Sequence, residues 1–156
     1  LDFFSGVYGL KGRERAAKIA EMVEAFDLQR YLRDSSETLP LGFKQRLALA
    51  CAIMHEPAVL FLDEPTSGVD PVTRREFWTH INGVVEKGVT VMVTTHFMDE
   101  AEYCDRLALV YRGQVIAAGT PDALKRQVAD ARRPEPTMEE AFIELVHRHD
   151  REVAHA

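Results

Sequence analysis

The segment Val59–Leu62 reads Val-Leu-Phe-Leu and runs directly into the carboxylates of Asp63 and Glu64. A short continuous apolar run is typical of a strand that is buried on both faces of a parallel sheet. In open α/β sheets, ligands bind at the carboxyl ends of such strands. We therefore expect Asp63 and Glu64 to lie at the edge where an α/β protein carries out its chemistry.

A second apolar segment, Val89–Thr94, is rich in β-branched residues and is followed by Thr95 and His96. Because the carboxyl ends of neighbouring parallel strands meet at one edge of a sheet, we expect His96 to lie beside Asp63 and Glu64. Each group also has a plainer interpretation, which is a polar turn at a strand end for the acids and a surface loop for the histidine.

The chain has 156 residues, which is enough for one domain with a core of its own. Its formal net charge of −6 argues against a protein that coats nucleic acid. No apolar stretch reaches the roughly 20 residues that span a bilayer. Cys51 and Cys104 lack the spacing of a metal site, so we expect free thiols in a reducing compartment. The start at Leu1, rather than at methionine, favours a piece of a longer protein.

Helical spacing of apolar residues and helix-start signals predict five helices. Asp70-Pro71 is a strong start, because Asp is a good N-cap and Pro fits the first helical position. Thr137–Glu140 forms a capping box. Residues 1–12 contain three glycines and predict a turn-rich opening instead. The expected helices cover 11–28, 43–55, 71–86, a short stretch that starts at Thr120, and 137 to about His147.

Two further strands are expected at Leu107–Tyr111 and Gln114–Ala118, on either side of a two-residue hairpin turn at Arg112-Gly113. The order of helices and strands predicts an α/β sheet with an antiparallel edge. Residues 129–136 contain two prolines and mixed charge, and they read as a linker.

The segment Leu39–Arg46 brings a glycine, Gly42, to the start of a helix whose first turn carries Lys44 and Arg46. Helix amino termini attract anions through free N–H groups and the macrodipole. An ordinary loop-to-helix junction remains the alternative. Adjacent carboxylates suit a division of labour in which one holds Mg²⁺ and the next deprotonates a water that attacks phosphorus.

Together these residues resemble the nucleotide-binding subunit of ABC transporters, from residue 1 to about 128. Val59–Glu64 looks like the Walker B strand, and Ser67–Asp70 is similar to the D-loop. His96 matches the switch histidine. Leu39–Arg46 occupies the position of the signature motif.

The resemblance implies an α/β P-loop NTPase (ABC ATPase) fold that is truncated to the helical subdomain and the C-terminal half of the parallel sheet. It divides the chain into a helical subdomain with the signature region (about 1–56), a core from Walker B onward (57–128), a linker (129–136) and a C-terminal helical tail (137–156). The tail looks like that of bacterial ABC-2-type exporter ATPases.

The resemblance also implies roles for particular residues and two cofactors, ATP and Mg²⁺. Asp63 would coordinate Mg²⁺, Glu64 would be the general base, and His96 would contact the γ-phosphate. The signature residues would contact ATP held by the opposite subunit, and the D-loop would communicate across that dimer. The signature set is Leu41, Gly42, Phe43, Lys44 and Gln45, and the D-loop set is Ser67, Gly68 and Asp70.

The sequence departs from the family pattern in two places. It contains no Gly-x-x-x-x-Gly-Lys-Ser/Thr loop, so we expect the chain alone to bind ATP very weakly and not to hydrolyse it. In the signature region Pro40, Leu41 and Phe43 stand where the family has serine, glycine and glutamine. Proline lacks both the hydroxyl and the N–H, so this half-site is expected to be weakened, with Lys44 compensating as a point charge.

The implied function is part of an ATP-binding subunit that couples ATP hydrolysis to export across a membrane. Its partners would be a transmembrane permease and a second nucleotide-binding domain, and nucleic acid would not be one. It would lie on the cytoplasmic face of the cell membrane, in contact with the membrane only through the permease. Two alternatives stay open: a non-catalytic module for dimerisation or permease contact, and a soluble ABC ATPase of repair or translation. Nothing in these residues specifies the transported substrate.

Overall fold

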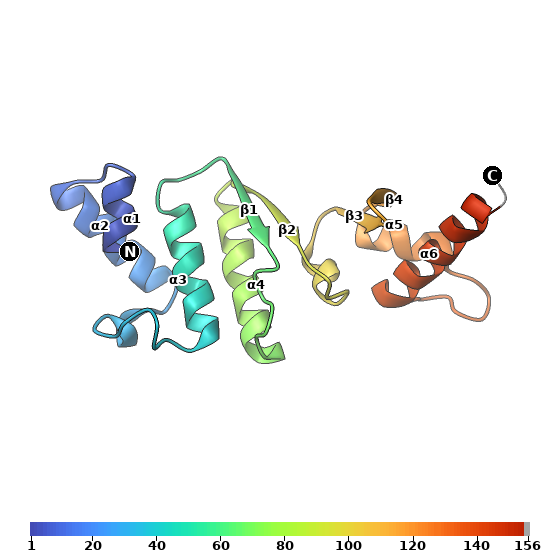
Figure 1. The fold of residues 1–156 in the computed structure, drawn as a ribbon, viewed down its shortest axis with the longest axis horizontal. Helices are drawn as coiled ribbons and strands as arrows, with labels where there is room; N and C mark the ends of the chain where they lie inside the picture. The colour runs from blue at the N-terminus through green and yellow to red at the C-terminus, as the bar shows by residue number, and fades with distance from the viewer. Residues whose placement is uncertain (155–156) are drawn as a thin grey trace. The chain divides into compact units, whose positions relative to one another are not determined.

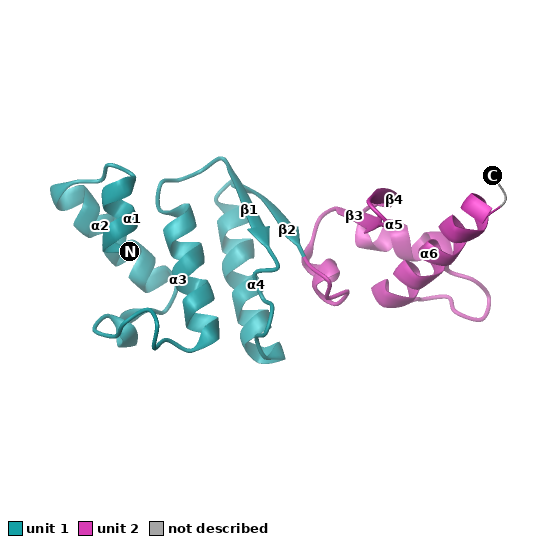
Figure 2. Cartoon of the chain, viewed as in Figure 1, with its two compact units in different colours: residues 1–94 teal, residues 95–156 magenta. Residues whose placement is uncertain are grey.

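The computed structural model describes residues 1–154, and the chain divides into two compact units, residues 1–94 and 95–156 (Figure 2). The last two residues of the expected C-terminal tail, 155–156, lie outside the described part. Within residues 1–154, no helix is both long enough and apolar enough to cross a bilayer.

The first unit contains four α-helices and a single 3₁₀ turn, all in the described residues. Figure 1 shows the third and fourth helices side by side, with the strands along the fourth. The helical elements are α1 (Asp2–Val7), α2 (Gly12–Ala25), η1 (Gln29–Tyr31), α3 (Leu41–Ile53) and α4 (Pro71–Glu86).

The prediction of a turn-rich opening in residues 1–12 missed a helix, because Asp2–Val7 forms α1. The Ser5 hydroxyl donates to the Asp2 carbonyl at 2.7 Å, and Arg15 of α2 donates to the Ser5 hydroxyl at 2.8 Å. Arg15 also pairs with the Asp2 carboxylate at 2.8 Å. These contacts with α2 hold a short helix that glycine spacing alone does not predict.

The predicted start of α4 is confirmed, since Asp70 Oδ1 accepts from the N–H groups of Val72 and Thr73, both at 3.1 Å. The start of α3 lies at Leu41, two residues earlier than predicted. Pro40 is its N-cap with φ −54°, and the Pro40 carbonyl accepts from the N–H of Phe43 at 2.9 Å.

The strands β1 (Val59–Asp63) and β2 (Thr90–Thr94) pair in parallel, with Asp63 opposite Thr94. Leu60 is buried, and α4 packs against this sheet. The prediction of a strand buried on both faces is wrong for the described residues, because Val59 and Phe61 are exposed, Phe61 to 73%. A parallel strand needs a layer on each face, and α4 supplies one.

The second unit contains η2 (Glu100–Tyr103), the hairpin strands β3 (Leu107–Tyr111) and β4 (Gln114–Gly119), and the helices α5 (Pro121–Val128) and α6 (Met138–Ala154). The hairpin is antiparallel and turns at Arg112 and Gly113, whose φ values of 49° and 76° suit a two-residue turn, as predicted. Within the described residues β1 pairs with β2 and β3 pairs with β4, each pair inside its own unit. That the hairpin forms an antiparallel edge of the parallel sheet therefore stays a prediction.

The capping box of α6 is confirmed. The Thr137 N–H donates to Glu140 Oε2 at 2.8 Å, and the Glu140 N–H donates to Thr137 Oγ1 at 3.2 Å. The helix continues to Ala154 rather than ending near His147. Asp150 explains part of this extra length, because it accepts from the Tyr111 hydroxyl at 3.3 Å and pairs with Arg112 at 3.2 Å.

Candidate functional site at the carboxyl ends of the parallel strands

The two predicted acids lie at the end of β1, and one side chain of the neighbouring strand holds both positions. The Thr94 hydroxyl donates to the Asp63 carboxylate. The Glu64 N–H donates to Thr94 as well. The Glu64 nitrogen lies 3.1 Å from the Thr94 carbonyl oxygen and 3.1 Å from the Thr94 hydroxyl oxygen. Both carboxylates are exposed, so they face the solvent side of this edge.

The backbone changes direction at Glu64. Its φ of 43° lies in the left-handed region, which costs a non-glycine residue roughly 1–2 kcal/mol. Its carbonyl accepts from the Ser67 N–H at 3.1 Å, which closes the turn after the strand. Because Asp63 is extended and Glu64 is left-handed, the two side chains leave the backbone in different directions, as two separate roles would require.

The predicted D-loop, residues 67–70, packs against the start of α3. Gly68 has φ +75°, and a Cβ there would lie 3.3 Å from Leu41 Cδ2. Gln45 Nε2 donates to the Ser67 carbonyl at 3.3 Å. The predicted D-loop and the predicted signature region are therefore neighbours in space.

Gly42 allows this approach. A Cβ at position 42 would overlap with Thr73 Cγ2 in the first turn of α4. Directly before that turn, Asp70 caps α4. Hydrogen bonds from the Thr73 hydroxyl and backbone lower the pKa of Asp70 below its usual value. Asp70 thus stays an anion beside the α4 amino terminus.

Phe43 and Lys44 differ in how far their side chains are buried. Phe43 is half-buried, and its ring centroid lies 4.6 Å from that of Tyr31 in η1. Lys44 is exposed. Of these two predicted nucleotide contacts, Phe43 is thus engaged within the chain and Lys44 faces solvent.

His96 is the second residue of the second unit, and its ring packs on Phe97 with a centroid separation of 4.1 Å. Since the boundary between the units falls after Thr94, the expected closeness of His96 to Asp63 and Glu64 stays a prediction.

The donor set at the β1–β2 edge consists of hard oxygens, the Asp63 carboxylate and the Thr94 hydroxyl. Mg²⁺ prefers such ligands and is usually held by one or two carboxylates together with substrate phosphates and waters. Residues 1–154 contain no cluster of three or more His, Cys, Asp or Glu side chains suited to a metal. One carboxylate and one hydroxyl are oxygen donors of the kind that Mg²⁺ accepts, and they would supply only part of its coordination shell.

Thr94 is the residue that the sequence interpretation missed. A signal existed, because Thr94 is the last residue of the second apolar segment and Asp63 ends the first. In-register parallel pairing places the two opposite each other.

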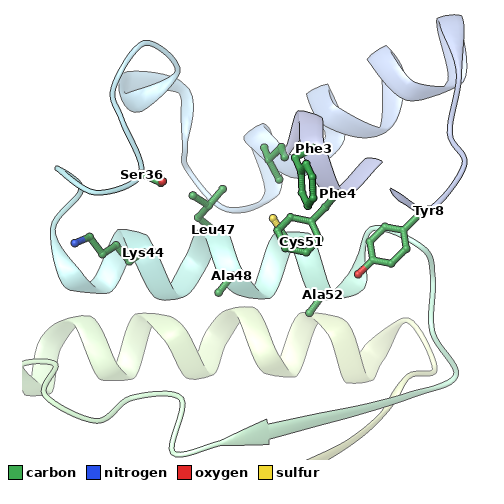
Figure 3. Close-up of a pocket in the computed structure, with 10 residues that line it drawn as sticks. Phe3, Phe4, Tyr8, Ser36, Lys44, Leu47, Ala48, Cys51 and Ala52 are labelled. Atoms are coloured by element: carbon green, nitrogen blue, oxygen red, sulfur yellow. The ribbon is translucent and has the colours of Figure 1, made fainter. Parts of the chain in front are cut away.

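A separate hollow of about 620 Å³ lies between α1 and α3 (Figure 3). Its walls are mainly apolar and aromatic, and neither Asp63 nor Glu64 lines it. Lining side chains include Phe3, Phe4, Tyr8, Lys44, Leu47 and Cys51.

The chain is similar to several known proteins in sequence and in fold. The ABC transporter family model matches residues 5–67. Over 97% of its length the chain is 69% identical to the probable multidrug ABC transporter ATP-binding protein YbhF of Escherichia coli (strain K12), of which it covers 26%. A solved ATP-binding subunit of an ABC transporter superposes with a TM-score of 0.74 at 29% identity, covering 92% of this chain and 59% of that one. In sequence and in fold the chain is similar to part of the ATP-binding subunits of ABC transporters.

A more distant ABC relative is the daunorubicin resistance ATP-binding protein DrrA3 of Streptomyces coeruleorubidus. It is 40% identical over 85% of the chain, which covers 42% of that protein. The chain thus spans about a quarter of YbhF and less than half of DrrA3. The predicted ABC ATPase fold class is confirmed.

Proposed function

We propose that this chain supplies the Walker B carboxylates, the D-loop and the signature helix of an ABC exporter's ATP-binding subunit. The observation that carries this proposal is the shared Thr94 contact to Asp63 and to the Glu64 backbone at the carboxyl edge of the parallel strands. The multidrug and daunorubicin-resistance relatives support export as the process that hydrolysis drives.

In the proposed reaction each acid has one task. Asp63, oriented by the Thr94 hydroxyl, would hold Mg²⁺, which when bound neutralises phosphate charge. Glu64 accepts a proton from the water whose oxygen attacks the γ-phosphorus, while the bond to the ADP oxygen breaks. His96 contacts the γ-phosphate.

The proposed partners are a transmembrane permease and a second nucleotide-binding domain, on the cytoplasmic face of the membrane. Leu41, Gly42, Lys44 and Gln45 would meet the ATP of the facing domain. The exposure of Leu41 and Lys44 supports this assignment, and the packing of residues 67–70 beside α3 supports a shared dimer surface.

The test uses the complete ATP-binding subunit together with its membrane subunit. Glu64→Gln should lower the ATPase rate at least about 100-fold while ATP binding remains, because the general base is lost. Glu86→Gln, an exposed carboxylate at the end of α4, is the matched control and should leave the rate unchanged. An active Glu64→Gln subunit would refute the assignment. The 156-residue chain alone should release no phosphate above its own Glu64→Gln variant.

A second candidate is a non-catalytic module that binds the permease or another subunit. The apolar hollow between α1 and α3, with Phe3 exposed to 74%, favours it. In that case Leu47→Asp should abolish co-purification with the membrane subunit, while Glu64→Gln should leave both ATP turnover and transport unaffected.

A further inference from the structure

Arg46, in the second turn of α3, is a cation with 5% of its surface exposed. Arg46 Nη1 lies 3.4 Å from Asp27, and Nη2 pairs with Glu76 of α4. A buried cation is tolerated only when it is well paired. Its Nε is nevertheless buried without a hydrogen-bond partner among the described residues.

The Arg46 guanidinium also lies against the ring of Phe43. Arg46 Cζ lies 4.8 Å from the Phe43 ring centroid, within cation–π range. The ring is itself held by η1, where Arg30 Cζ lies 4.5 Å away and the Tyr31 ring 4.6 Å away. Phe43 therefore sits between the helical segment around residue 30 and the buried guanidinium.

We propose that Phe43 is a positioning residue for Arg46, and that this pair sets how α3 sits against α4 and the D-loop. The Arg46–Glu76 pair joins α3 to α4. One turn earlier, Gly42 abuts Thr73, and Gln45 donates to the Ser67 carbonyl at 3.3 Å. When Arg46 is held less firmly, α3 shifts against α4, and these contacts pass the shift on to residues 67–70.

This inference rests on the proposed function only for the role of the D-loop. It reassigns Phe43, which the family resemblance placed among the nucleotide contacts. The side chain acts through Arg46 and does not touch ATP.

The first test is a double-mutant cycle on the 156-residue chain, followed by the fluorescence of Trp78, its single tryptophan, which is buried in α4. Phe43→Leu should lower the folded-to-unfolded ratio at least about fivefold. The same change should have little effect in an Arg46→Met background, because the cation is gone. Phe43→Tyr should retain the wild-type ratio, and Phe3→Leu, at an exposed position, is the control.

Additive effects of Phe43→Leu and Arg46→Met would overturn the proposal. If Arg46→Met does not fold, the comparison at position 43 still decides, because equal losses for Phe43→Leu and Phe43→Tyr would show that the ring face is not needed.

The second test measures turnover in the complete subunit. Phe43→Leu should lower kcat with an unchanged KM for ATP, Phe43→Tyr should restore it, and Phe43→Gln should behave like Phe43→Leu. A Phe43→Gln subunit with a lower KM and undiminished stability would overturn the proposal. If the wild-type subunit hydrolyses no ATP, the proposed function fails, while the stability cycle still decides the Phe43–Arg46 coupling.

Discussion

The Thr94 hydroxyl donates a hydrogen bond to the Asp63 carboxylate across the paired ends of β1 and β2. The same threonine receives the N–H of Glu64. One uncharged side chain therefore fixes the position of two adjacent acids whose own side chains face solvent.

Thr94→Val should keep the strand and lose both hydroxyl contacts. We expect a loss of about 1 kcal/mol in the free energy of unfolding, measured by urea titration. In the complete subunit, the Mg²⁺ concentration needed for half-maximal turnover should rise about 10- to 100-fold, because the ligand loses its orienting partner. Thr90→Val, at the other end of β2, should change neither value; equal effects at the two positions would contradict the role of Thr94.

Gly42→Ala should destabilise the chain, although alanine normally stabilises a helix by about 1 kcal/mol relative to glycine. The added methyl overlaps with Thr73 Cγ2, and such overpacking costs about 1–3 kcal/mol. Thr73→Ser removes the opposing methyl and should rescue Gly42→Ala. Gly83→Ala in α4, where a Cβ meets nothing within 4 Å, should raise the urea midpoint. A stabilised Gly42→Ala chain would show that α3 and α4 are not in close contact.

His80 should make the first unit less stable in mild acid. Burial, and then the nearby Arg46, lower the pKa of His80 below its usual 6.5, against the opposing influence of Asp27 and Glu76. The unfolded chain therefore binds more protons below pH 6.5, so stability falls as the pH drops through 6.5 and levels off below the folded-state pKa. Urea unfolding of His80→Gln, read from Trp78, should show a smaller fall between pH 7 and 5.5. His147→Gln in the second unit should reproduce the wild-type profile, and an unchanged profile for His80→Gln would refute the prediction.

Pro40→Ser should give α3 the side-chain cap that it lacks. A serine N-cap is worth about 1 kcal/mol, offset in part by the greater freedom of the unfolded chain without proline. If the missing hydroxyl is what weakens the half-site, turnover by the complete subunit should also rise many-fold. An unchanged rate, with a raised unfolding midpoint as proof of capping, would count against the weakened half-site.

Elements that depend on neighbouring residues could be predicted from the sequence. The Asp70-Pro71 helix start, the Arg112-Gly113 turn and the Thr137–Glu140 box each combine side-chain and backbone preferences within four residues. Their geometry is local, so tertiary packing has little opportunity to override it.

Features that depend on distant contacts could not be predicted in this way. Helix α1 is held by Arg15, and the last turns of α6 contact the hairpin through Asp150. The apolar run around Phe61 predicts two covered faces, whereas coverage depends on which other segments pack there. At the candidate site the acids could be read from the sequence, but the threonine that orients them required the strand register.

Because one side of β1 is uncovered, a label at position 61 can report whether another polypeptide binds there. Phe61 is 73% exposed, whereas its neighbour Leu60 is buried. The strand therefore places one side chain in water and the adjacent one in the core. An environment-sensitive label at position 61 would therefore register any polypeptide that comes to lie over that face, and would do so without disturbing the side of the sheet that α4 holds.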